Sequence, residues 1–137
     1  MKVSKEYKWE MGHRLVFHEG KCNNLHGHSY KAKIELTGTL DKNGMVLDFF
    51  IIDSIMEKIL GVLDHSFIVY KEDKKLLRLL TELEFKHLIF ETECTAENLV
   101  LYLLKQIKEY GLPANIAKVK VAVYETEDAF AEDETEL

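Results

Sequence analysis

The chain has 137 residues, 47% of them hydrophobic, and a formal net charge of −6. That length and apolar content predict one globular domain over residues 1–137, because no segment rich in Pro, Gly or Ser divides the chain. The negative charge excludes a general nucleic-acid surface, and no apolar run approaches the roughly 20 residues that cross a bilayer. Two cysteines are too few for a secreted disulfide framework. The composition therefore predicts a soluble cytoplasmic protein with free thiols.

Two strands joined by a loop are predicted in the first 40 residues. From Val3 to His13 the odd positions are apolar, with one exception, and the even positions are polar, which is typical of a half-buried strand. From His26 to Leu40 the apolar side chains stand at even positions. If the two strands pair antiparallel across the loop 14–25, the end of the first lies beside the start of the second.

Three histidines fall on the buried faces of these strands. His13 ends the first strand, and His26 and His28 open the second, where side chains two residues apart point to the same side. Three neutral imidazoles in one place suit zinc. Any one of them taken alone is more commonly an ordinary core or surface histidine. Cys22, four positions before His26, is either a fourth ligand that closes a structural site or a free thiol available for chemistry.

Helices and further strands are predicted in the rest of the chain. Three helices follow from apolar periodicity and end signals: one capped by Asp48 and ended by Gly61, one over Lys74–Leu83, and one over Ala96–Tyr110 capped by Thr95. Further strands are predicted over 45–47, 85–90 and 116–125. The acidic tail 127–137 is expected to be partly disordered, with only 129–131 able to form a strand.

A carboxylate stands at the end of the last long strand. Glu125 continues the apolar stripe formed by Val119, Val121 and Val123. Burying an unpaired charge is costly, so Glu125 is expected to have a partner. One possible partner is a lysine across the sheet.

Six short motifs occur in order along the chain: Gly12-His13-Arg14-Leu15, Cys22-x-x-x-His26-Gly27-His28-Ser29, Gly44-Met45-Val46-Leu47-Asp48-Phe49, Leu63-Asp64-His65, Thr95-Ala96-Glu97-Asn98 and Tyr124-Glu125-Thr126. Together they resemble the 6-pyruvoyl-tetrahydropterin synthase and 6-carboxytetrahydropterin synthase family over about residues 7–126. The resemblance implies an α+β tunnelling fold, in which an antiparallel sheet of two hairpins has helices inserted between them. It also implies that subunits assemble into an oligomeric barrel, as a trimer or hexamer, with active sites at subunit interfaces.

The resemblance also implies a role for individual residues. The matched positions are the zinc ligands His13, His26 and His28, the catalytic cysteine Cys22, its acid–base partners Asp64 and His65, and the pterin-binding residues Glu125 and Thr95. Without the family pattern, the Asp64-His65 pair reads as a cap for the segment that follows it. Three basic residues are candidates for binding a triphosphate: Arg14, Lys21 and Lys31.

The spacing between Cys22 and His26 is similar to that of the queuosine-pathway branch of the family. The implied activity is that of a zinc-dependent lyase, which converts 7,8-dihydroneopterin triphosphate into 6-carboxy-5,6,7,8-tetrahydropterin, acetaldehyde and triphosphate. Two alternatives stay open. One is 6-pyruvoyl-tetrahydropterin synthase activity, with elimination of triphosphate, and the other is a non-catalytic, zinc-stabilised module that binds a pterin or purine.

Overall fold

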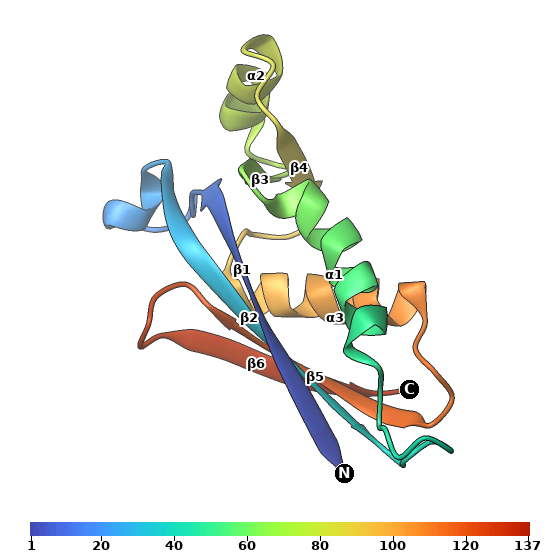
Figure 1. Ribbon diagram of the computed structural model, residues 1–137. Coiled ribbons are helices and arrows are strands. Elements are labelled where there is room, and N and C mark those ends of the chain that lie inside the picture. The colour runs from blue at the N-terminus through green and yellow to red at the C-terminus, as the bar shows by residue number, and fades with distance from the viewer.

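The computed structural model covers residues 1–137 and shows a six-stranded sheet with three α-helices (Figure 1). The elements follow in chain order: β1 (Lys2–His13), β2 (His26–Gly38), α1 (Phe49–Leu63), β3 (Ser66–Tyr70), α2 (Lys74–Glu82), β4 (His87–Phe90), α3 (Ala96–Tyr110), β5 (Ile116–Tyr124) and β6 (Phe130–Glu136). A short 3-10 helix, Lys21–Asn23, lies in the loop between β1 and β2. The strand order across the sheet is β4-β3-β1-β2-β5-β6.

Four strands form the antiparallel part of the sheet. β1 and β2 make a long hairpin whose register sets His13 opposite His26 and Met11 opposite His28. β5 pairs antiparallel with β2 on one side and with β6 on the other. Because side chains alternate across a strand, every second residue faces the same side. The buried members of this set are Trp9, Met11, Tyr30, Ala32, Ile34, Leu36, Val119, Val121 and Val123.

Helices α1 and α3 cover one face of the antiparallel strands, and the other face carries no helix (Figure 1). The helices bury apolar side chains against the strands, among them Ile52, Met56, Ile59, Leu99, Leu103 and Ile107. The helix-free face carries charged side chains in ion pairs across neighbouring strands, for example Lys120 with Glu132 at 2.7 Å. The sheet is therefore apolar toward the helices and charged on its other side.

A smaller unit made of β3, α2 and β4 extends beyond the end of the β1–β2 hairpin (Figure 1). β3 runs parallel to β1 and pairs with it only through Met11 and Gly12, and β4 runs parallel to β3. The unit has a small core of its own, formed by Val69, Leu76 and Leu80.

The helix signals in the sequence are largely confirmed. Asp48 and Thr95 cap α1 and α3 with their side chains, and α3 covers Ala96–Tyr110 as predicted. α1, however, passes through Gly61 and ends at Leu63. None of the three helices is long and apolar enough to span a bilayer.

The structure differs from the sequence analysis in two elements and in the direction of two strands. Residues 45–47 form no strand, because Val46 and Leu47 pack into the core just before the cap of α1. Residues 66–70 form β3, which was not predicted. Since β3 and β4 are parallel to their neighbours, the sheet is mixed and not wholly antiparallel.

The acidic tail also differs from the expectation of partial disorder over 127–137. Residues 130–136 form β6, well beyond the three residues expected to be able to form a strand. Lysines on β5 explain this order, because Lys118 lies 2.8 Å from Glu134 and 3.2 Å from Glu136. The acidic side chains of β6 thus neutralise the lysines of β5.

Candidate metal centre and binding hollows

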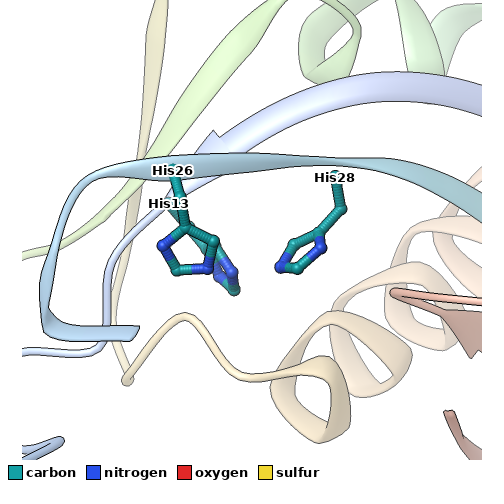
Figure 2. A group of neighbouring side chains, drawn as sticks. All are labelled: His13, His26 and His28. Atoms are coloured by element: carbon teal, nitrogen blue, oxygen red, sulfur yellow. The ribbon is translucent and has the colours of Figure 1, made fainter. Parts of the chain in front are cut away.

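Three imidazole rings converge at one end of the β1–β2 hairpin (Figure 2). His13 comes from β1, and His26 and His28 come from β2. The ring centroids are 4.7 Å apart for His13 and His26, 5.2 Å for His13 and His28, and 5.0 Å for His26 and His28. One nitrogen from each ring lies within 4.8 Å of the other two, so the group could hold a metal ion.

Backbone carbonyls fix the orientation of two of these rings. Nδ1 of His13 lies 2.6 Å from the carbonyl oxygen of Cys94, and Nδ1 of His26 lies 2.7 Å from that of Asn24. A carbonyl only accepts, so each Nδ1 carries the proton and each Nε2 keeps its lone pair for a metal. His13 is fully buried. His26 and His28 are only half-buried, whereas the sequence analysis placed all three histidines on buried faces.

The surroundings of His13 and His28 favour the neutral imidazole, which is the form that binds metal. Burial lowers the pKa of His13 to about 4, although its hydrogen bond to Cys94 acts in the opposite direction. The pKa of His28 is also lowered, again mainly by burial. A donor set of three converging imidazoles fits a metal such as zinc.

Cys22 lies in the loop that follows His13 and is half-buried. Its carbonyl oxygen accepts a hydrogen bond of 2.8 Å from the Leu15 N–H, and the side-chain amide of Asn23 donates to two further loop carbonyls. Cys22 does not belong to the group of converging ligand atoms. The geometry therefore favours the free thiol over the closed site with a fourth ligand.

Glu125 and Thr95 line one hollow of about 340 Å³ beside the histidines. Oε1 of Glu125 lies 3.8 Å from Nε2 of His13, and no lysine across the sheet forms an ion pair with this carboxylate. Thr95 caps α3, and the loop residues Leu15 and Phe17 form an apolar part of the wall. A carboxylate, a helix N-terminus and apolar side chains thus surround a space next to the candidate metal centre.

Asp64 and His65 form an exposed ion pair, with Oδ2 of Asp64 3.0 Å from Nδ1 of His65. Neighbours in sequence can meet here because His65 has φ +54, which bends the chain. The Glu10 N–H donates to the Asp64 carboxylate, and this hydrogen bond, with the His65 ring, lowers the pKa of Asp64. His65 lines a second hollow of about 600 Å³, whose other lining residues include Glu10, Ser29, His26 and His28. Within one chain no hydrogen bond or ion pair joins Asp64 or His65 to the three histidines.

Arg14, a candidate for binding a triphosphate, already forms an ion pair with Asp73. Its Nε and Nη2 each lie 2.6 Å from an oxygen of Asp73, which is 4% exposed. Burial raises the pKa of Asp73, but the Arg14 guanidinium and the Leu76 N–H outweigh it, so that this pKa lies below its usual value. The ion pair links the start of the loop 14–25, called the Cys22 loop below, to the N-terminus of α2.

Several supporting residues were not found from the sequence. The carbonyl of Cys94 orients His13, and the hydroxyl of Tyr30 lies 3.4 Å from Nε2 of the same ring. Tyr30 could have been found, because it follows His26 and His28 on the same face of β2. The Cys94 carbonyl could not, since any residue type supplies a backbone acceptor.

The fold and this site define a class of protein: an α+β chain with a candidate three-histidine metal centre at the edge of a carboxylate-containing hollow. The family model of 6-pyruvoyl tetrahydropterin synthase matches residues 2–136. The 6-carboxy-5,6,7,8-tetrahydropterin synthase of Haemophilus influenzae is 34% identical over 96% of both chains, and that of Aquifex aeolicus is 33% identical over 95% of both. The chain belongs to the 6-pyruvoyl tetrahydropterin synthase family.

Solved structures agree in fold. The 6-pyruvoyl tetrahydropterin synthase of Plasmodium falciparum matches with a TM-score of 0.79 and 19% identity, over 100% of this chain and 98% of that one. The Caenorhabditis elegans enzyme of the same name gives a TM-score of 0.72 and 24% identity, over 98% and 95%. The α+β tunnelling fold that the sequence motifs imply is thereby confirmed.

Proposed function

We propose that the protein converts 7,8-dihydroneopterin triphosphate into 6-carboxy-5,6,7,8-tetrahydropterin, acetaldehyde and triphosphate, as a zinc-dependent carbon–oxygen and carbon–carbon lyase. The observation that carries the proposal is the convergence of His13, His26 and His28 beside the hollow that contains Glu125. The relatives named 6-carboxy-5,6,7,8-tetrahydropterin synthase support the same product. The proposal includes a role in queuosine precursor synthesis and a cytoplasmic location, which the two free cysteines favour.

In this proposal His13, His26 and His28 hold the zinc through ring nitrogens. Three protein ligands leave one coordination position open, as in catalytic zinc sites. When bound, zinc acts as a Lewis acid that makes a side-chain hydroxyl of the substrate more acidic.

Glu125 is the proposed anchor of the pterin ring. Its carboxylate accepts hydrogen bonds from the amino group and a ring N–H of the pterin, and this paired contact fixes the ring orientation. Thr95, in the same hollow, helps to hold the ring at the N-terminus of α3. The side chain of the substrate then extends from the hollow toward the three histidines.

Cys22, Asp64 and His65 are the proposed proton-transfer residues. The thiolate of Cys22 removes and returns protons at carbon, and His65 accepts the thiol proton. Asp64, in contact with His65 Nδ1 at 3.0 Å, fixes the orientation of the ring. Because no hydrogen bond or ion pair joins Asp64 or His65 to the histidine group of its own chain, we propose that they act on the site of a neighbouring copy.

Two free sheet edges support an assembly that would bring these residues together. The outer edge of β1 pairs only at Met11 and Gly12, and β6 has a partner on one side only. Adjacent strands alternate in direction from β1 to β6, so β6 of one copy can pair antiparallel with β1 of the next and close a barrel. Asp64 and His65 are hydrogen-bonded to the backbone of Glu10 at this edge of β1, where β6 of the next copy would pair.

We therefore expect the purified protein to be a homo-oligomer, a trimer or a hexamer. Closing the barrel pairs the free edges of β1 and β6, which would otherwise be exposed. Size-exclusion chromatography with light scattering gives the mass. A monomer at micromolar concentration would contradict the shared site.

The reaction itself is tested with the zinc-loaded protein and 7,8-dihydroneopterin triphosphate. We expect 6-carboxy-5,6,7,8-tetrahydropterin and acetaldehyde, both identified by mass spectrometry, because the open zinc position and the proton-transfer residues allow carbon–carbon cleavage. If 6-pyruvoyl-tetrahydropterin forms instead, the protein is the elimination enzyme. If the protein binds the pterin but shows no turnover, it is the non-catalytic binding module.

A further inference from the structure

Lys86 joins the end of α1 to the start of β4. Its Nζ donates to the carbonyl oxygens of Gly61 and Asp64, at 2.7 Å each. The last carbonyls of a helix have no partner within the helix, and a cation at this end is favoured by the helix dipole. Lys86 therefore satisfies two carbonyls at the point where the chain turns from α1 into Asp64 and His65.

The backbone at this turn is strained. His65 adopts φ +54, a left-handed conformation that side-chain-bearing residues rarely take and that costs about 1 kcal/mol or more. Such a conformation persists only when its surroundings fix it. The His65 N–H donates to the Glu10 carbonyl at 2.7 Å, and the Glu10 N–H donates to Asp64 at 2.9 Å. Lys86 closes the turn from its other side.

We propose that Lys86 is a positioning residue for the Asp64–His65 pair. The inference rests on the proposed function, in which this pair takes part in proton transfer. Lys86 forms no hydrogen bond or ion pair with the imidazole or the carboxylate, although its charge is among the causes that lower the pKa of Asp64; it acts mainly through the two carbonyls that fix the turn. Without it the left-handed turn relaxes, and the ring of His65 spends less time in the geometry that reaches the neighbouring site.

The test compares Lys86→Met, Lys86→Arg and the matched control Lys71→Met in the assembled, zinc-loaded protein. Lys71 lies in the same β3–α2–β4 unit, but its Nζ pairs only with the exposed Glu91, at 2.7 Å. We expect Lys86→Met to lower kcat about tenfold with KM unchanged, because one charged hydrogen-bond donor is lost and the substrate contacts stay intact. Lys86→Arg restores most of kcat, and Lys71→Met leaves it unchanged.

A double variant separates positioning from a general loss of stability. In the background His65→Gln, Lys86→Met has no further effect on kcat if it acts through His65, whereas an additive loss overturns the proposal. Equal kcat values for Lys86→Met and Lys71→Met overturn it as well.

Hydrogen exchange gives a readout that does not depend on turnover. We expect the amide of His65 to exchange about tenfold faster in Lys86→Met than in Lys71→Met, because the turn opens more often. If the wild type shows no turnover, the proposed function fails, and equal exchange rates in the two variants show separately that Lys86 does not hold the turn.

Discussion

Replacing Cys22 by alanine is expected to lower kcat by at least about a hundredfold while the protein keeps its metal. The three histidines converge without help from Cys22, whose sulfur is not among the ligand atoms that lie within 4.8 Å of one another. The metal should therefore stay bound. Loss of a base at carbon typically costs about 10²- to 10⁴-fold in rate, so kcat should fall by that amount.

Metal analysis and steady-state kinetics on the same sample check this expectation. His28→Ala serves as the control in which metal is lost first, because it removes one of the three ligands. Loss of metal from Cys22→Ala would show that the cysteine closes a structural site. Alkylation adds a second check, because Cys94 is buried and its burial raises the pKa of its thiol to about 12, so Cys22 should react first.

The convergence of the three histidines could be predicted from the sequence because a strand fixes the direction of its side chains. The alternation over 3–13 and 26–40 put His13, His26 and His28 on one face, and the observed register sets His13 directly opposite His26. A long hairpin with one apolar face has little freedom to slip, since a shift of one residue would turn that whole face to solvent.

Contacts between distant segments could not be predicted in the same way. The hydrogen bond from His13 to Cys94 joins residues 81 positions apart through a backbone carbonyl, which leaves no mark in the residue type. β3 was missed because both its faces pack against other elements, so its five residues lack the alternation of a half-buried strand. The left-handed conformation of His65 could not be predicted either, because non-glycine residues adopt it only uncommonly.

Replacing Arg14 by methionine is expected to lower the free energy of unfolding by about 3 kcal/mol, because it leaves the carboxylate of Asp73 buried without its cation. Two charged hydrogen bonds of 2.6 Å are lost, and only the Leu76 N–H is left to Asp73. Glu93 adds to the effect, since burial and the nearby charge of Asp73 already raise its pKa while Arg14 lowers it. The stability of the β3–α2–β4 unit and the anchoring of the Cys22 loop should fall together.

The pH dependence of this effect has a definite sign. The folded-state pKa of Asp73 lies below its unfolded value, so the ion pair contributes stability above the unfolded pKa of about 3.9 and loses it as the pH falls through the folded pKa. The gap between wild type and Arg14→Met should therefore be widest at neutral pH and close as the pH falls into the acidic range in which the Asp73 carboxylate becomes protonated.

Urea unfolding of matched variants measures the effect and identifies its cause. Lys71→Met removes an exposed pair from the same unit and should cost far less than Arg14→Met. Adding Asp73→Asn to Arg14→Met should recover more than about 1 kcal/mol, because it removes the unpaired charge while the asparagine still caps α2. If the double variant were no more stable than Arg14→Met, packing of the Arg14 side chain, and not its charge, would hold the Cys22 loop against α2.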